Sequence, residues 1–528
     1  MRPFDLGVIA LYLIAVTWFG ARFRKSQISL KDYFLGGRNA PWWAISLSIV
    51  SAETSTLTIV GTPALAFSGN FGFLQIVFGY LLARIVISVI LLPHYFRGEL
   101  YTAYELMQRR FGPRIRKVTS MTFLVTRSLA EGVRVFAVSI VVSVILGTGE
   151  VASILLIVAL TVFYTFEGGM TAVIWTDVVQ MCMYVAGAAL SLAVIIQQAQ
   201  GGLFHALDVA AQFHKFRIFD FSLPVSAAFF DKPYTFLAGI VGGCFLTTAS
   251  HGTDQLVVQR LLSARNQRES RLALLSSWVV VFLLFSLFLL IGALLFVYYR
   301  ENHLPPPQPM DRLYPRFVWE KLPVGAAGLV MAAILAAAMA NLSAALNSLA
   351  SATVVDFFGG KKDLQQMGLA RWATVFWAAV LIAIGLVARH WGSVLESGLS
   401  IASVTLGILL GVFLLGVLTE RVGENAAIAG VIAGLAVILY VKLATRVAFT
   451  WWVPIGACST FLAGCAASWL GTDGPGAAAP LVLLGHKMWD ATWRGHSCLL
   501  RPDSSGRGSR RVSTRQAEAC ATSRNIYD

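Results

Sequence analysis

Long apolar segments recur along almost the whole chain, and they constrain the fold more than any other feature. A helix needs about 20 mainly apolar residues to cross the hydrocarbon core of a bilayer. Segments of that length alternate here with short polar loops, and 57% of the 528 residues are hydrophobic whereas only 13% are charged. The pattern predicts an all-α polytopic membrane protein and excludes an ordinary water-soluble domain.

We expect about thirteen transmembrane helices. Six precede the first long loop and seven follow it, and their predicted ranges are 4–21, 42–66, 73–96, 118–147, 150–166, 171–196, 235–262, 272–299, 325–355, 370–389, 396–419, 425–444 and 451–471.

The loops that follow odd-numbered spans are basic, and they predict the orientation. Arg24 follows the first span, Arg114 the third, Arg265 the seventh and Lys361 the ninth. Because basic loops stay in the cytoplasm, the N-terminus is expected outside and the C-terminus inside. The net charge of +14 therefore reflects topology, and we expect membrane lipid rather than nucleic acid as a partner.

Residues 472–528 differ in composition from the rest of the chain. They are rich in Arg, Ser and Gly and poor in large aliphatic residues, so we predict a basic, disordered cytoplasmic tail. Either the tail is loosely held, or it touches anionic lipid headgroups. Its deletion at about residue 475 should leave transport intact.

The sequence contains no motif for covalent chemistry. The six cysteines have no metal-ligand spacing, and neither a nucleotide-binding loop nor a catalytic dyad is present. We therefore expect no enzyme activity and no organic cofactor.

The segment 325–358 combines small apolar residues with polar ones. In an Ala- and Leu-rich background its second half carries Asn341, Ser343, Asn347, Ser348, Ser351 and Thr353. Unpaired polar groups are costly in hydrocarbon. The cluster therefore indicates close helix packing, a hydrated cavity or a bound ion.

The span 42–66 is unusually polar for a membrane helix. Several hydroxyl residues and Glu53 interrupt its apolar run, which ends with Gly61 and Pro63. An unwound segment would expose carbonyls that can coordinate a cation. The alternative is a continuous helix with a simple kink at Pro63, its hydroxyls bonded to its own backbone.

Charged residues within the span 118–147 share one helix face. Arg127 and Glu131 are four residues apart, and Glu131 and Arg134 are three apart, so the three side chains are neighbours. They form either a structural ion-pair network or part of a binding site for an anionic substrate.

Two further spans carry ionisable groups at membrane depth. Asp177 requires a counter-charge, for which a passing cation and a neighbouring arginine are equally reasonable. Near one end of the span 235–262 lie His251, Asp254 and Arg260. His251 is either a packing residue or a binding residue. Asp254 and Arg260 either anchor the helix at the membrane interface or take part in function.

Three separated motifs resemble the sodium/solute symporter family: GGMTAVIWTDVVQ, GTDQLVVQRLLSARN and AALNSLASATVVDF. The resemblance covers roughly residues 1–470. It implies one transporter domain over 1–471 with the leucine-transporter-like fold. Two inverted five-helix repeats would occupy about 42–196 and 235–419, flanked by helices 4–21, 425–444 and 451–471.

The resemblance also implies a sodium site. Its backbone carbonyls would come from Leu47, Val50 and Ala337. The family's two adjacent hydroxyls correspond here to Ala340 and Asn341. Only the Asn341 amide oxygen can replace a hydroxyl ligand, so Ser343, one turn from position 340, is added to the expected set. Asp177 matches the family carboxylate on the intracellular route of sodium.

The resemblance also implies a substrate site near the bilayer midplane, but the sugar-binding pattern of the family is not reproduced. By position its candidates are Glu53, Thr54, Gln75, Tyr80, His251 and Ser397. The substrate class remains open among carboxylates, amino acids and polyols.

The sequence thus predicts a secondary active transporter in the cytoplasmic membrane that couples inward sodium movement to uptake of a small organic solute by alternating access. The expected partners are sodium, the solute and membrane lipid, and no other metal is expected. A sodium-independent or proton-coupled carrier and a transporter-like membrane sensor are the alternatives, and the oligomeric state stays open.

Overall fold

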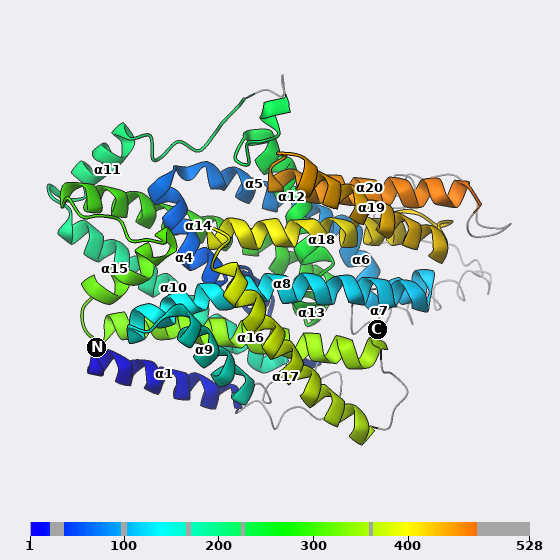
Figure 1. Cartoon of the computed structure of the whole chain (residues 1–528), viewed down its shortest axis with the longest axis horizontal. Coiled ribbons are helices and arrows are strands. Elements are labelled where there is room, and N and C mark those ends of the chain that lie inside the picture. The colour runs from blue at the N-terminus through cyan, green and yellow to red at the C-terminus, as the bar shows by residue number, and fades with distance from the viewer. Residues whose placement is uncertain are drawn as a thin grey trace, which may run out of the picture. The chain divides into compact units, whose positions relative to one another are not determined.

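The computed structural model describes residues 2–21, 36–96, 103–164, 170–222, 227–357 and 363–471. All the described ranges belong to one compact unit, and every regular element in them is a helix (Figure 1). The predicted disordered tail at 472–528 lies outside the described residues, as do most of the basic loop residues at 22–35, 97–102 and 358–362.

The helices that precede the first long connection are α1 (Pro3–Ala21), α3 (Trp42–Glu53), α4 (Thr56–Ser68), α5 (Leu74–Val86), α6 (Leu92–Tyr95), α7 (Ala103–Phe111), α8 (Pro113–Leu146), α9 (Glu150–Tyr164) and α10 (Met170–Gln198).

Those that follow it are α11 (Gly202–Gln212), α12 (Phe236–Gly252), α13 (Gln255–Leu262), α14 (Gln267–Glu301), α15 (Leu313–Lys321), α16 (Ala326–Phe357), α17 (Asp363–Ala388), α18 (Val394–Leu418), α19 (Glu424–Ala444) and α20 (Trp452–Trp469). Short helical turns η2 (Gly36–Arg38), η3 (Phe71–Phe73), η4 (Ile87–Leu91), η5 (Ala227–Phe229), η6 (Met310–Arg312) and η7 (Phe449–Trp451) join them.

Within the described residues, eight helices are long and apolar enough to cross a bilayer. Helices α3 and α4, bent by 63° at their junction, form a ninth candidate if they are one broken span, and four shorter helices are also apolar. The expected number of thirteen spans is therefore not established by length and hydropathy alone, and it stays a prediction.

The break in the first polar span lies earlier than the sequence suggests. Helix α3 ends at Glu53 and α4 starts at Thr56, whereas Gly61 and Pro63 lie inside α4. Gly61 instead permits close packing, because a Cβ there would come within 2.6 Å of the Leu395 Cβ. The carbonyl of Pro63 similarly abuts Gly292 of α14. The expectation that Gly61 and Pro63 mark the unwound segment is wrong.

The predicted span 235–262 is also interrupted. Helix α12 ends at Gly252, and Asp254 caps α13 by accepting a hydrogen bond from the Leu256 amide. Two helices, α11 and α15, occupy connections that were expected to be loops. Both polar spans are thus broken helices. Sequence periodicity does not predict at which residue each helix breaks.

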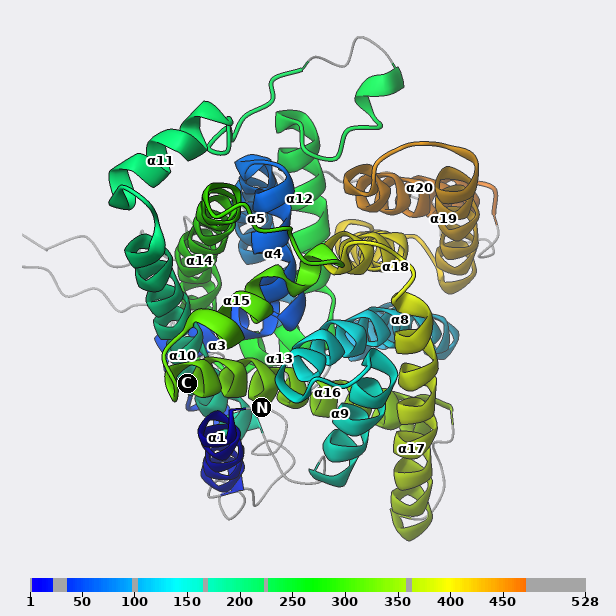
Figure 2. The ribbon, with the colours of Figure 1, turned by 60° about the vertical axis from the view of Figure 1, so that its left-hand side comes forward.

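Glycines bring α5 and α12 into close contact, and the two helices lie side by side in Figures 1 and 2. A Cβ on Gly79 would lie 2.6 Å from the Gly239 carbonyl oxygen, and one on Gly243 would lie 2.3 Å from the Ile76 carbonyl oxygen. Such backbone contact is typical of small residues at membrane helix interfaces.

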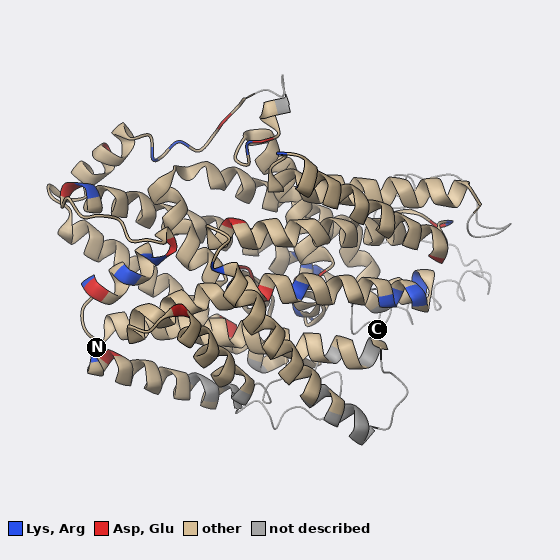
Figure 3. Ribbon diagram, viewed as in Figure 1, with Lys and Arg blue, Asp and Glu red and all other residues tan. Residues whose placement is uncertain are grey.

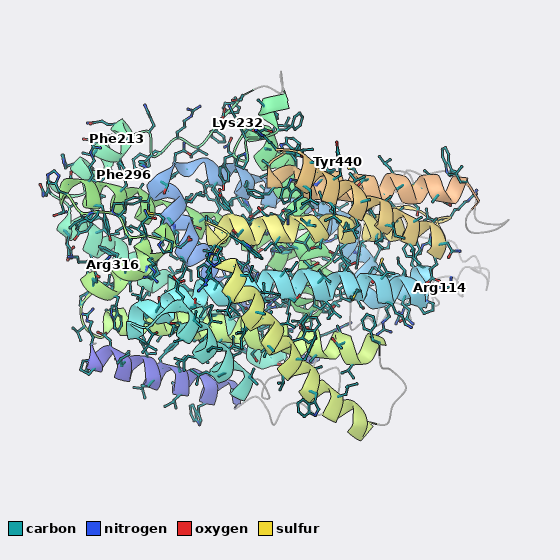
Figure 4. The ribbon with its side chains drawn as sticks, in the orientation of Figure 1. Arg114, Phe213, Lys232, Phe296, Arg316 and Tyr440 are labelled. Carbon is teal, nitrogen blue, oxygen red and sulfur yellow. The ribbon has the colours of Figure 1, made fainter. Side chains whose placement is uncertain are left out.

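Lys and Arg residues gather along α7 and the start of α8 (Figure 3). Arg114 lies at that end of the helices, whereas Arg316 lies at the opposite end (Figure 4). The distribution defines two ends of the helical unit, although which of them faces the cytoplasm stays a prediction.

Candidate functional site

A cavity of about 190 Å³ lies between the two broken helices. Residues of α3 and α4 form one wall and residues of α12 and α13 another, and α5, α8, α14, α16 and α18 complete the lining. Its polar residues include Glu53, Ser55, Thr58, Tyr80, Thr126, Arg127, Arg134, Thr247, Ser250, His251, Asp254, Arg260 and Asn341. The site therefore lies where both spans lose their regular backbone.

The junction between α3 and α4 opens the backbone beside this cavity. The Thr54 amide still donates to the Val50 carbonyl at 2.7 Å, but the Ser55 amide donates to the Glu53 carbonyl instead of continuing the helix. Helix ends leave carbonyls and amides without intrahelical partners. The junction thus presents carbonyls at the end of α3 and amides at the start of α4.

Glu53 lies at the centre of a buried polar cluster on one side of the cavity. Its Oε2 accepts from Arg84 Nη2 at 2.6 Å and lies 3.2 Å from His251 Nε2. The fully buried Arg84 also donates to the Ser277 hydroxyl and the Tyr80 carbonyl. The intramembrane carboxylate therefore has a guanidinium counter-charge supplied by α5.

Two arginines of α8 form the opposite polar surface. Arg127 Nη2 lies 2.8 Å from Glu131 Oε1, and Arg134 Nη1 contacts the same oxygen. The Nε groups of both arginines are buried and lack a hydrogen-bond partner within the described part of the chain. Arg127 also approaches Asp254 at 3.8 Å. Each guanidinium therefore has one buried N–H that no described residue accepts, and both residues line the cavity.

A second, much smaller cavity of about 10 Å³ adjoins this surface. It is lined by Ser55 and Thr56 at the start of α4, Glu131 and Arg134 of α8, and Asn341 of α16, together with apolar side chains. Asn341 and Arg134 line both cavities. Asn341 of α16 therefore lies beside the junction of α3 and α4.

Asp177 of α10 is held by an arginine. Its Oδ2 accepts from Arg260 Nη2 at 3.0 Å and from the Ser48 hydroxyl at 2.5 Å, and Arg260 Nε donates to the Ser48 oxygen at 2.8 Å. Of the two counter-charges that the sequence left open, the structure contains the neighbouring arginine. The network links α3, α10 and α13.

The expected sodium ligands lie on two helices that do not pack extensively on each other. Leu47 and Val50 belong to α3, which packs mainly on α10 and α14. Ala337, Asn341 and Ser343 belong to α16, which packs on α1, α8, α10 and α17. Of the five, only Asn341 lines the cavity. Their role as a sodium site stays a prediction.

The six pocket candidates divide into two groups. Glu53, Tyr80 and His251 line the cavity, whereas Thr54, Gln75 and Ser397 are not among its lining residues. Thr54 is fully buried at the junction. The Gln75 side chain donates to the Gly72 and Tyr234 carbonyls and accepts from the Asp220 amide, and the Ser397 hydroxyl donates to the Trp391 carbonyl.

Sequence reasoning missed one partner of a site residue and one contact outside the cavity lining. Arg84 was not considered as a partner of Glu53, although a single arginine inside an apolar span is itself a signal. Tyr234, in the connection before α12, donates its hydroxyl to Glu396 at 2.7 Å, and no local pattern predicts that contact across 162 residues.

A charged cavity between two interrupted apolar helices is typical of a membrane carrier. The chain belongs to the sodium:solute symporter family, whose model matches residues 33–434. It is therefore an integral membrane transporter that couples sodium to the movement of a small organic solute, and sodium is its coupling ion.

Curated relatives and solved structures support this assignment. The chain is 28% identical to the sodium/sialic acid symporter SiaT of Proteus mirabilis, over 87% of this chain and 94% of that protein. It is also 28% identical to the human sodium/iodide cotransporter, over 83% of this chain and 69% of that protein.

Among solved structures, the substrate-bound outward-open state of a Na+-coupled sialic acid symporter matches with a TM-score of 0.75 and 26% identity, over 88% of this chain and 98% of that chain. Mhp1, a nucleobase-cation-symport-1 family transporter, shares the fold with a TM-score of 0.55 and 13% identity, over 84% of this chain and 95% of that chain. The protein thus has the leucine-transporter-like fold.

Proposed function

We propose that the protein carries a small organic carboxylate into the cell together with sodium. The observation that supports this most directly is the pair Arg127 and Arg134, which both line the cavity and each keep a buried Nε donor without a partner in the described residues. A guanidinium presents parallel donors that match a carboxylate. A neutral solute would leave these buried donors unsatisfied, at a cost of about 1–3 kcal/mol each.

The start of α4 adds to this anionic preference. Ser55 and Thr56 line the small cavity beside Arg134, and the amides of a helix N-terminus attract negative charge. A carboxylate at this position would approach α8 and α4 together.

The names of the relatives agree with an anionic solute. They include transporters for sialic acid and iodide and a sodium-coupled monocarboxylate transporter from Bos taurus, and each of these substrates is an anion. The shared property supports an anion more strongly than any particular compound.

For sodium we propose a site between the carbonyls of Leu47 and Val50 on α3 and Ala337, Asn341 and Ser343 on α16. Sodium would draw the end of α3 toward α16 and favour the state that binds the solute. The binding of sodium and the binding of the solute would then be linked by a coupling free energy. Asp177 would then receive sodium on its way to the cytoplasm, at the place where Arg260 now lies.

The proposed topology has thirteen spans, formed by the eight long helices, the bent α3–α4 pair and the four shorter apolar helices. The repeats would run over about 42–196 and 235–419 within a transporter domain at 1–471, with the N-terminus outside. Both repeats would begin with a broken helix, which supports the inverted arrangement.

The test is uptake into proteoliposomes with and without a sodium gradient, using the wild-type chain and Arg134→Gln. We expect sodium-driven accumulation of carboxylates, with KM raised about tenfold or more in the variant, because a charge-assisted bidentate contact is lost. Glu131 keeps Arg127 as its partner, so folding should be preserved. The exposed Arg316, which pairs with Glu320, provides the control variant Arg316→Gln.

A proton-coupled or sodium-independent carrier is the second candidate function, since Ala340 removes one expected ligand and the cavity contains Glu53 and His251. Accumulation that ignores the sodium gradient would favour it. A carboxylate KM that is the same in wild type and Arg134→Gln would contradict the anion site.

A further inference from the structure

We propose that Glu53 forms a second recognition subsite that accepts a hydrogen bond from a hydroxyl group of the transported carboxylate. The inference rests on the proposed function and narrows the solute to hydroxylated organic anions. It starts from the two different polar surfaces of one cavity, the arginine pair of α8 and the Glu53 cluster of α3, α5 and α12.

Among the described residues, hydrogen-bond partners contact only one oxygen of the Glu53 carboxylate. Arg84 Nη2 and His251 Nε2 both contact Oε2. Each carboxylate oxygen can accept more than one hydrogen bond, and Glu53 lines the cavity with its side chain 10% exposed. Oε1 is therefore the oxygen that is available to a molecule in the cavity.

The charge of Glu53 is already compensated. Arg84 lies 2.6 Å away and is fully buried behind the carboxylate, which makes it a permanent counter-charge. Oε1 therefore needs a hydrogen-bond donor and does not need a further positive charge. A neutral hydroxyl meets that need, whereas an ammonium group would add an uncompensated positive charge to a water-poor site.

The contacts of His251 are consistent with this assignment. Its Nε2 lies 3.2 Å from Glu53 Oε2, and its Nδ1 lies 2.9 Å from the Ser250 hydroxyl. A neutral imidazole that donates from Nε2 and accepts at Nδ1 satisfies both contacts. His251 then orients the Glu53 carboxylate.

Besides the two polar surfaces, the cavity lining contains apolar side chains, which include Leu57, Phe73, Phe285 and Leu395. A solute that binds both surfaces needs a carboxylate on one part and a hydroxyl on another, joined by carbon. An unsubstituted carboxylate would leave Oε1 without a partner in the closed state, which disfavours it.

The experiment compares three carboxylates with a six-carbon chain on the purified full chain in the presence of sodium: hexanoate, gluconate and 6-aminohexanoate. Gluconate has a hydroxyl on every carbon beyond the carboxylate, so the unknown position of the hydroxyl does not matter. Affinities are measured by calorimetry on the wild type, Glu53→Gln, and the control Glu396→Gln, whose carboxylate pairs with Tyr234.

We expect the wild type to bind gluconate about tenfold more tightly than hexanoate or 6-aminohexanoate, since a hydrogen bond to a charged acceptor is stronger than one between neutral groups. Glu53→Gln should reduce that preference to less than about threefold, and Glu396→Gln should keep it. If Glu53→Gln does not fold, Glu53→Asp retains the charge opposite Arg84 while withdrawing the carboxylate from the cavity.

Each other result is decisive. Equal affinity for gluconate and hexanoate, or preference for 6-aminohexanoate, would overturn the hydroxyl subsite and leave the carboxylate function standing. Failure of all three anions to bind would overturn the carboxylate function and the subsite with it. A gluconate preference that survives both substitutions at Glu53 would place the hydroxyl contact elsewhere.

Discussion

Asp177 and Arg260 are both almost fully buried, and each is the other's charge partner. A buried ion pair adds little net stability, but removing one partner leaves an unpaired charge at a cost of about 3–5 kcal/mol. We therefore predict that Asp177→Asn lowers the thermal unfolding temperature strongly.

The double variant Asp177→Asn with Arg260→Met should recover much of that loss. Thermal unfolding in detergent of both single variants and the double variant gives the coupling directly. Additive effects of the two substitutions would show that the pair does not act as a unit.

Asn341 lies beside the junction of α3 and α4, where an amide oxygen can replace a missing hydroxyl ligand. If Asn341 contributes to the sodium site, Asn341→Ala should raise the sodium concentration for half-maximal uptake about tenfold or more, as loss of one ion–oxygen contact implies. An unchanged sodium dependence would contradict this role. Ala340→Ser, which restores a hydroxyl, should shift the sodium dependence in the opposite direction.

At the scale of elements, α5 and α12 are in backbone contact at Gly79. A methyl group there would meet the Gly239 and Ile240 carbonyl oxygens at 2.6 and 2.7 Å, and backbone atoms cannot move aside cheaply. We predict that Gly79→Ala destabilises the protein by about 1–3 kcal/mol, as overpacking usually does.

Gly7→Ala in α1 is the matched control, because a Cβ at Gly7 has no neighbour within 4 Å. It should be neutral or slightly stabilising, since alanine favours the helix. Equal unfolding temperatures for the two alanine variants would disprove the close packing of α5 and α12.

The turn η6 carries a carboxyl that should make stability depend on pH. Burial, together with nearby Glu396, raises the pKa of Asp311 to about 6, although the hydrogen bond from the Val394 amide opposes this shift. Because the folded state then binds more protons than the unfolded state between about pH 4 and 6, stability should fall as pH rises through that window.

The expected change is on the order of 3 kcal/mol. Asp311→Asn, which retains an acceptor for the Val394 amide, should remove this pH dependence and raise the unfolding temperature at pH 7.5. Unfolding curves of the wild type and of Asp311→Asn at pH 4.5 and 7.5 would measure this difference in pH dependence. Equal pH dependence in the two proteins would contradict the role given to Asp311.

For the whole molecule, the proposed orientation is testable at the two ends of the helical unit. Arg114 and Arg316 lie at opposite ends (Figure 4). With Arg114 cytoplasmic, a cysteine at position 316 should react with a membrane-impermeant maleimide in intact cells, and one at position 114 only after permeabilisation. The reverse pattern would invert the topology.

Local composition predicted the class of the fold and several elements of the site. The polar spans at 42–66 and 235–262 are both broken helices, and Glu53, Tyr80, His251 and Asn341 line the cavity. The sequence did not place the break at Thr54 and Ser55, because Gly61 and Pro63 are stronger local signals than the helix end that tertiary packing selects.

The sequence by itself determined that the chain is a polytopic helical membrane protein of the symporter family, since hydropathy and motifs are properties of neighbouring residues. Only the tertiary structure decided which charges are paired. Arg84 neutralises Glu53, and Arg260 pairs with Asp177. Arg260 also donates to Ser48, which lies 212 residues earlier in the chain. Charge partners in a low-dielectric interior are fixed by distances between helices, and one sequence contains no record of those distances.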